Sequence, residues 1–368
     1  MNSWHTARNA NARNAREAQP PVCTAVIGAG YWGPNIIRNL HTTPGATVKA
    51  VCDIDRAALT KIARRWPSVA FETDVRRVLR DDAIEAVAIA TPVGTHAELA
   101  EAALLAGKHV FVEKPLASSS SDAMALIALA KQRGLVLMPG HTFLYSPAVT
   151  YIRTLIRDGK LGEIQFISMS RLNLGLHQPG VSVIWDLGPH DISILRYWLD
   201  EMPARVSAMS RGCVVHDTPD VAFLNLQFGS GTIASIEIGW LSPTKLRRTV
   251  IVGSEKMVVY DDTSAEPVRV YDSGVTLPDP ANFGEYHLSY RTGDIVSPAL
   301  DPIEPLYLEL EDFCSAVRNG HEPRATAGLG LDVVRVAEAI DRSLDNGGAP
   351  VAVAPEITLG ASEAQAAC

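Results

Sequence analysis

The spacing of hydrophobic residues along the chain changes near residue 140. Before that point, short apolar runs alternate with longer segments that carry apolar residues at helical spacing. Strands alternating with helices predict a parallel sheet joined by right-handed crossovers, so we expect a doubly wound α/β domain over residues 21–140. The expected strands are 22–27, 48–52, 68–71, 86–90, 109–112 and 135–138, with helices at 56–66, 74–79, 95–105 and 121–131.

After Gly140 two helical stretches, 147–158 and 186–199, are accompanied by runs in which apolar and polar residues alternate. This alternation predicts an α+β domain over residues 141–352 with a large, open, mainly antiparallel sheet. Such a sheet usually has its outer face covered, so we expect a homodimer or homotetramer formed through it. The expected strands are 164–171, 205–209, 220–228, 232–240, 247–252 and 256–260, and helices at 304–319 and 329–344 close the fold.

Three segments do not follow either hydrophobic pattern. Residues 1–20 are polar and rich in Asn, Ala and Arg, which predicts a disordered tail, with an organellar transit peptide as the alternative. Residues 353–368 are expected to be a second flexible tail. Residues 274–302 are rich in Gly, Pro and Asp and contain Tyr286, His287, Tyr290 and Arg291, so they are either a substrate lid or a disordered loop.

Composition narrows the class of protein. The chain has 368 residues, 47% of them hydrophobic, which is enough for two domains, and a net charge of −8 with both signs mixed. It shows no basic footprint for nucleic acid, no apolar run of membrane-spanning length and no apolar signal core, so we expect a cytoplasmic protein with small-molecule partners. Five scattered cysteines give neither a disulfide framework nor a zinc ribbon.

The first strand runs directly into the glycine pattern Gly28-x-Gly30-x-x-Gly33, with Tyr31 and Trp32 inside it. Gly28 permits a tight strand-to-helix turn, Gly30 lets the backbone approach a pyrophosphate, and Gly33 lets the helix lie close to the strand. The helix N-terminus then presents unpaired N–H groups to the anion. This is the phosphate-binding turn of a dinucleotide fold.

Asp53 ends the second strand, twenty residues after Gly33. An acidic side chain at this place accepts hydrogen bonds from the adenosine ribose and repels a 2′-phosphate, so NAD is favoured over NADP. Arg56 lies close enough in sequence to soften that preference. The alternative is an ordinary solvated loop carboxylate.

Further polar residues follow the ends of the fourth and fifth expected strands. Parallel strands deliver ligand-binding groups at their carboxyl ends, so Glu113 and Lys114 should reach the crevice where a nicotinamide lies. Pro115 should fix the turn, and a cis bond before it is one way to do so. The loop Thr91-Pro92 with Thr95-His96 should meet the nicotinamide ribose, unless Thr95 only caps the next helix. The expected cofactor residues are Gly28, Gly30, Tyr31, Trp32, Gly33, Asp53, Arg56, Thr91, Pro92, Thr95, His96, Glu113 and Lys114.

In the second domain, Asp186 and His190 are four residues apart and share one face of a helical turn, where a carboxylate can orient an imidazole for proton transfer. They make a poor zinc site because no further ligand lies in a suitable pattern, and we expect no metal. The expected substrate residues are Lys114, Arg171, Asn173, His177, Asp186, His190 and Trp240. Three further cations either bind an anionic group of the substrate or are solvated: Lys245, Arg247 and Arg248.

The glycine turn, the Thr91-Pro92 loop, Glu113-Lys114-Pro115 and the Asp186/His190 pair together resemble the glucose–fructose oxidoreductase/inositol dehydrogenase/MocA family over residues 22–352. The Tyr-Trp-Gly-Pro-Asn form of the turn is similar to its nucleotide-sugar 3-dehydrogenase branch. The resemblance implies hydride transfer between a secondary hydroxyl, expected at C3 of a sugar or nucleotide-sugar, and NAD.

The resemblance also makes Lys114, Asp186 and His190 the catalytic set. His190 would take the hydroxyl proton while Lys114 stabilises the alkoxide, or Lys114 would itself be the base. Alternatives are a nucleoside or aminoglycoside substrate of antibiotic biosynthesis, and a non-catalytic dinucleotide-dependent sensor on the same fold.

Overall fold

The computed structural model describes residues 20–175, 177, 180–276 and 289–353. Of the expected tails at 1–20 and 353–368, residues 1–19 and 354–368 lie outside the described residues, as do Tyr286 and His287. No helix in the described part of the chain is long and apolar enough to cross a membrane.

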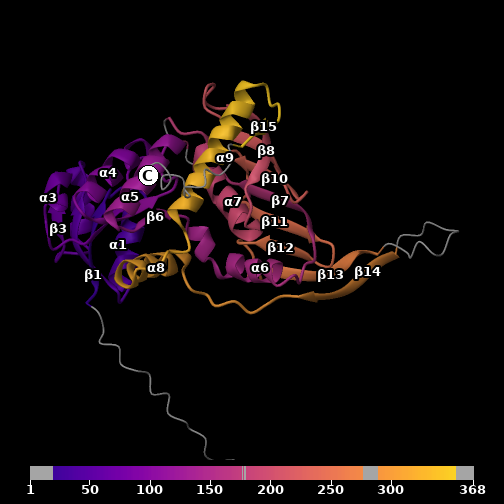
Figure 1. Ribbon diagram of the computed structural model, residues 1–368, viewed down its shortest axis with the longest axis horizontal. Helices are drawn as coiled ribbons and strands as arrows, with labels where there is room; N and C mark the ends of the chain where they lie inside the picture. Colours follow the sequence, from indigo (N-terminus) through magenta and orange to yellow (C-terminus); the bar gives the residue numbers. More distant parts are fainter. Residues whose placement is uncertain (1–19, 176, 178–179, 277–288, 354–368) are drawn as a thin grey trace, which may run out of the picture.

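The N-terminal part is built on a sheet of six parallel strands in the order β3-β2-β1-β4-β5-β6 (Figure 1). The strand order reverses between β1 and β4, which is where a doubly wound sheet opens a crevice at the carboxyl ends of its strands. The strands are β1 (Val22–Ile27), β2 (Ala46–Cys52), β3 (Ala70–Glu72), β4 (Ala86–Ile89), β5 (His109–Glu113) and β6 (Leu137–Gly140). The predicted doubly wound domain is confirmed.

Helices cover both faces of this sheet. One face packs against α1 (Gly33–Thr42) and against α8 (Pro305–Asn319), which returns from the far end of the sequence and inserts Leu310 and Phe313 into the core. The other face packs against α4 (His96–Leu105) and α5 (Ser120–Arg133). The short helices α2 (Arg56–Ala63) and α3 (Val75–Leu79) flank β3.

The C-terminal sheet has nine strands in the order β14-β13-β12-β11-β7-β10-β9-β8-β15. It is mainly antiparallel, as predicted, but β7 and β10 at its centre run parallel, so it is not a simple meander. A pair this far apart in sequence leaves no local turn signal. The strands are β7 (Ile164–Leu172), β8 (Pro203–Arg211), β9 (Val221–Phe228), β10 (Ile233–Gly239), β11 (Leu246–Gly253), β12 (Met257–Asp261), β13 (Val268–Thr276), β14 (Ser289–Val296) and β15 (Val351–Ala352).

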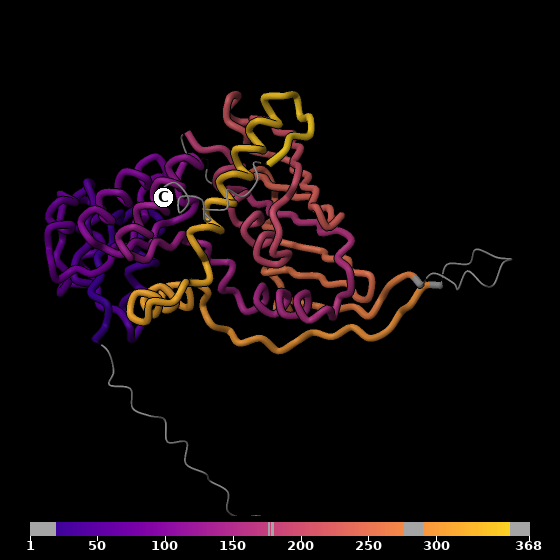
Figure 2. The backbone as a smooth tube through the Cα atoms, viewed as in Figure 1, coloured from indigo at the N-terminus to yellow at the C-terminus, as the bar shows by residue number. Residues whose placement is uncertain are grey.

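The segment 274–302 was expected to be a lid or a disordered loop, and for much of its described part this is wrong. Residues 274–276 belong to β13 and residues 289–296 to β14, two strands that run side by side in Figure 2. They pair antiparallel, with Val275 opposite Tyr290. The error arose because Gly, Asp and Pro are unfavourable in strands, yet at a sheet edge cross-strand pairing overrides that preference.

One face of the C-terminal sheet is covered and the other is open. The covered face packs against α6 (Pro147–Arg157), α7 (Val183–Leu199) and α9 (Ala327–Asp345), which cross it in Figure 1. Along β9 the alternation is regular, with Leu224 and Leu226 buried and Phe223 50% exposed on the outer face. The outer face also exposes Phe166, Met209 and Ile233.

Candidate active site

The glycine turn between β1 and α1 is tightly fitted on two sides and open on a third. A Cβ on Gly28, whose φ is +101°, would lie 2.5 Å from the Ala90 carbonyl oxygen, and a Cβ on Gly33 would lie 2.2 Å from the Gly28 oxygen. A Cβ on Gly30 would meet nothing within 4 Å. Only Gly30 therefore faces open space, which fits the close approach of a pyrophosphate to the backbone.

Asp53 is tied to this turn. Its carboxylate accepts the backbone N–H of Ala29 at 2.6 Å and that of Asp55 at 2.7 Å, so it is not simply a solvated loop residue. Tyr31 and Trp32 pack edge to face at 5.8 Å and are 77% and 43% exposed beside the turn. Arg56 is exposed at the start of α2 and lines a hollow between α2 and Asp74.

The loop after β4 is joined to the turn after β5 by a buried histidine. His96, 1% exposed, places Nδ1 2.8 Å from the Pro115 carbonyl oxygen and Nε2 2.8 Å from that of Thr91. The peptide bond between Lys114 and Pro115 is cis. The Thr95 hydroxyl contacts the Thr91 hydroxyl and the Pro92 carbonyl rather than capping α4.

Lys114 spans the two domains. Its Nζ donates to the Asp186 Oδ1 at 2.9 Å and to the Asp186 backbone oxygen at 2.7 Å. The side chain is only 11% exposed and that of Asp186 21%. Asp186 lies in the first turn of α7, which begins after the N-cap residue Ser182. The structure thus brings together two residues that are 72 positions apart.

His190 follows one turn later on α7. Burial, and then the positive charge of Lys114, lower its pKa well below the ordinary value, so the imidazole is neutral near pH 7. Its Nδ1 has no hydrogen-bond partner among the described residues, because the Asp186 carboxylate contacts Lys114 instead. Phe143 packs against the imidazole edge to face at 4.9 Å.

Two arginines lie behind Phe143. Arg171 and Arg247 are cross-strand neighbours on β7 and β11, with guanidinium carbons 4.5 and 5.8 Å from the Phe143 ring centroid. Arg171 is 6% exposed and makes two bonds to the Asp191 carboxylate, at 2.7 and 2.8 Å. Arg247 contacts Asp262 at 3.2 Å and is more exposed. Each guanidinium therefore already has a carboxylate partner.

The remaining expected substrate residues are not brought into contact with Lys114. Trp240 is 1% exposed, and His177 packs against it at 5.1 Å and lies 3.5 Å from the buried Asp220. The Asn173 backbone N–H donates to Gly239 at 3.2 Å. Lys245 and Arg248 are exposed.

Two buried carboxyl groups adjoin the crevice, and one of them was not predicted. Burial raises the pKa of Glu113 to about 7, and burial also raises that of Glu309, on α8, well above its ordinary value. Glu309 Oε2 accepts the Thr142 hydroxyl at 2.6 Å. Glu309 and Phe143 carried no motif, and only the apolar neighbours of Glu309 in its helix could have indicated burial.

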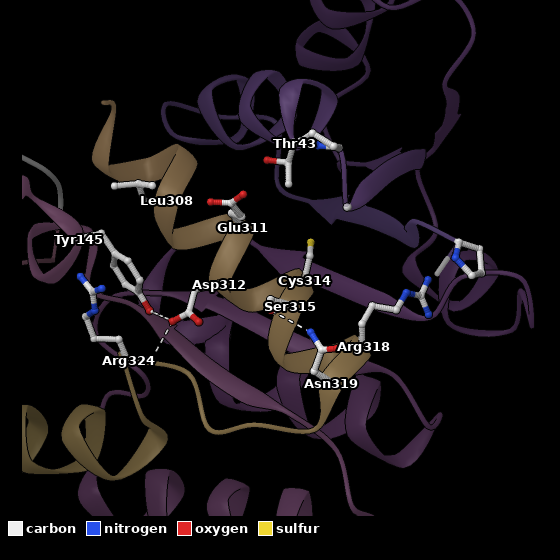
Figure 3. Close-up of a pocket in the computed structure, with 13 residues that line it drawn as sticks. Thr43, Tyr145, Leu308, Glu311, Asp312, Cys314, Ser315, Arg318, Asn319 and Arg324 are labelled. Carbon is white, nitrogen blue, oxygen red and sulfur yellow. Dashed lines mark hydrogen bonds between the residues drawn. The ribbon is translucent and has the colours of Figure 1, made fainter. Parts of the chain in front are cut away.

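A hollow of about 1340 Å³ lies elsewhere, between α8 and the loop Thr43–Gly45 (Figure 3). Its polar groups are largely paired with one another: the Tyr145 hydroxyl donates to Asp312 at 2.6 Å, and the Arg324 backbone N–H donates to the same carboxylate at 2.8 Å. None of the expected site residues lines it. Within the described ranges, no group of three or more His, Cys, Asp or Glu side chains could hold a metal ion.

Glu309→Gln tests the protonation of the buried carboxyl. The folded protein holds its proton, whereas the unfolded chain releases it above the ordinary pKa of 4.5. Stability of the wild type relative to Glu309→Gln is therefore greatest at low pH and falls as pH rises toward the folded pKa, by up to about 1.4 kcal/mol per pH unit.

The measurement is the free energy of unfolding of both proteins at about pH 5 and about pH 8. Glu311→Gln, on the exposed side of the same helix, is the matched control and should show no such trend. A pH-independent difference for Glu309→Gln would mean that Glu309 is ionised in the folded protein.

Comparisons with known proteins agree with this geometry. Residues 22–141 match the model of an oxidoreductase family with an NAD-binding Rossmann fold, and residues 149–259 match that of the GFO/IDH/MocA C-terminal domain. A crystal structure described as an oxidoreductase from Magnetospirillum magnetotacticum is 31% identical, covers 87% of this chain and 99% of its own, and superposes with a TM-score of 0.75.

Two further relatives have more specific descriptions. UDP-N-acetylglucosamine 3-dehydrogenase from Acidithiobacillus ferrooxidans is 27% identical over 82% of this chain and 90% of its own. GenD2 from gentamicin A biosynthesis, solved in complex with NAD, is 26% identical over 91% of this chain and 97% of its own, with a TM-score of 0.77. The chain therefore belongs to the Gfo/Idh/MocA family of oxidoreductases, with an N-terminal NAD-binding Rossmann domain.

Proposed function

We propose that this enzyme transfers hydride between NAD and a secondary hydroxyl of a sugar or nucleotide-sugar, at C3. The observation that carries the proposal is the contact between Lys114, at the carboxyl end of β5, and Asp186 on α7, one turn before His190. This is the edge at which such a sheet presents a bound dinucleotide to its substrate.

The proposed chemistry divides between hydride and proton. When bound at the glycine turn, NAD would supply the acceptor for the hydride that leaves the carbinol carbon. As the carbonyl forms, the hydroxyl proton passes to the neutral imidazole of His190, and the Lys114 ammonium donates a hydrogen bond to the oxygen as its negative charge develops. Asp186 holds Lys114 in place through its carboxylate and backbone oxygens.

Two observations support His190 rather than Lys114 as the base. Lys114 already donates its N–H groups to two Asp186 oxygens, so these contacts use it as a hydrogen-bond donor. The His190 Nδ1 atom, in contrast, has no partner within the described structure. Burial of His190 keeps the imidazole unprotonated, so one ring nitrogen carries a lone pair.

The substrate class follows from the relatives. UDP-N-acetylglucosamine 3-dehydrogenase motivates C3 of a nucleotide-sugar, whereas GenD2 motivates the second candidate, an aminoglycoside-type or nucleoside sugar of antibiotic biosynthesis. Arg247 is partly exposed beside Phe143, and an anionic group of the substrate would share it with its present partner Asp262.

A substrate panel tests the proposal. The purified protein is mixed with NAD and nucleotide sugars, free sugars, nucleosides and aminoglycosides, and reduced-nicotinamide absorbance is followed together with product mass. We expect one class to be oxidised with the loss of two hydrogens. Failure of every class in both the oxidative and the reductive direction, despite NAD binding, would contradict the proposed activity.

Lys114→Met and His190→Asn should each lower kcat by at least about 100-fold, because each removes a group that acts on the reacting oxygen. NADH affinity, measured by fluorescence titration, should stay nearly unchanged. A parallel loss of cofactor affinity in both variants would instead give these residues a structural role.

Asp53→Ala should weaken NAD binding by about tenfold or more, because the carboxylate both fixes the Ala29 N–H of the glycine turn and accepts ribose hydroxyls. Asp53→Asn is the matched control, because asparagine has nearly the shape of aspartate without its charge. Isothermal titration with NAD and NADP separates affinity from selectivity. Unaltered NAD affinity in Asp53→Ala would remove this residue from the cofactor site.

The open face of the C-terminal sheet supports a proposed homodimer or homotetramer. Phe223, opposite Met209 on β8, and Ile233, opposite Phe166 on β7, expose apolar side chains there. Phe223→Lys should shift the mass measured by light scattering toward the monomer. An unchanged mass would place the interface elsewhere. The cytoplasm remains the proposed location.

A further inference from the structure

His141 is a buried residue without an apparent structural reason. It follows the last residue of β6, is 1% exposed, and neither ring nitrogen has a hydrogen-bond partner in the described part of the chain. Most buried polar side chains are hydrogen-bonded, because leaving them unpaired is destabilising. A histidine with two unpaired buried nitrogens therefore requires an explanation.

The position of His141 supplies one. Gly140 is the register partner of Glu113, so the next residues, His141 and Lys114, leave neighbouring parallel strands at the same edge of the sheet. A positive charge on His141 would lower the pKa of His190 on α7, so the two side chains are close enough to affect one another. Its imidazole thus lies beside both groups proposed to act on the reacting oxygen.

The protonation of His141 limits what it can bind. Burial, and then the charge of Lys114, lower its pKa to about 3, so the ring is neutral at physiological pH. A neutral imidazole carries one N–H donor and one acceptor nitrogen. Each ring nitrogen can therefore pair with one hydroxyl group, which accepts from the N–H or donates to the other nitrogen.

His96 provides an internal comparison. It is equally buried and lies at the same end of the sheet, but both of its ring nitrogens are 2.8 Å from carbonyl oxygens. His96 joins two loops of the Rossmann domain. His141 makes no such connection, so its burial serves something other than the packing of the protein.

We propose that His141 is a substrate-binding residue that hydrogen-bonds a second hydroxyl, on a carbon adjoining the one that is oxidised. The inference rests on the proposed function and deepens it. Lys114 and His190 take the reacting oxygen, and His141, beside both, takes its neighbour. The site would then select vicinal diols, as found in sugars, over secondary alcohols that have no neighbouring hydroxyl.

Stability and cofactor binding form the first arm of the test. His141→Phe removes two unpaired polar atoms, so the melting temperature should stay the same or rise, and the NADH dissociation constant should change by less than about twofold. His96→Phe, the matched substitution, should lower the melting temperature by at least about 3 °C. An equal fall in both variants would make His141 structural, and a tenfold loss of NADH affinity would assign its contact to the cofactor.

Substrate selectivity forms the second arm. The probe is the panel sugar that the wild type oxidises fastest, paired with analogues deoxygenated at each adjoining carbon. The wild type should prefer the parent sugar over one analogue by about tenfold or more in kcat/KM, and His141→Phe should bring that ratio near one.

The two arms separate the inference from the proposed function. Wild-type turnover of the parent sugar tests the proposed function alone, whereas the ratio tests His141. If His141→Phe loses activity equally on the parent and on both analogues, or if the wild type does not distinguish them, the proposed contact is contradicted while the dehydrogenase activity stands.

Discussion

The ion pair between Lys114 and Asp186 is the constraint on which the rest of the site depends. An ammonium group that is 11% exposed is costly to bury unless it is paired, and here one residue supplies both a carboxylate and a backbone oxygen. Because Lys114 follows the last residue of β5 and Asp186 lies in the first turn of α7, this pair fixes that turn against the carboxyl ends of the Rossmann strands. His190, one turn further along, is thereby placed at the same edge.

Burial around this pair sets the protonation of its neighbours. His141 and His190 are kept neutral by desolvation and by the positive charge of Lys114, whereas Glu113 and Glu309 are held toward their protonated forms. Burial thus lowers the charge carried by these four groups, and the ions around them are paired, Lys114 with Asp186 and Arg171 with Asp191. Such an environment suits a reaction in which charge develops on a single oxygen and must be stabilised by directed hydrogen bonds.

The sequence allowed prediction of those parts of the fold that leave local signals. The glycine turn, the alternation of strands and helices, and the residues at the carboxyl ends of β4 and β5 all follow from short-range patterns. The family resemblance grouped Lys114 with Asp186 and His190 across the domains, and the structure brings Lys114 into contact with Asp186. The parallel pairing of β7 with β10 could not be predicted, because no turn joins these strands, and the β13–β14 ladder was missed because Gly and Asp are unfavourable in strands. Glu309 and His141 were missed for a similar reason: only the return of α8 and the neighbouring ends of β5 and β6 show that these polar residues are buried.

The most direct test of the central claim follows the hydrogen itself. A sugar that the enzyme oxidises is prepared with deuterium on the carbinol carbon. The reduced nicotinamide is then analysed by mass spectrometry after a single turnover. The deuterium should appear in the nicotinamide ring. Turnover should be slower than with the unlabelled substrate if hydride transfer limits the rate. If a fully labelled carbinol gave reduced nicotinamide without deuterium, direct hydride transfer at the site of Lys114 and His190 would be contradicted.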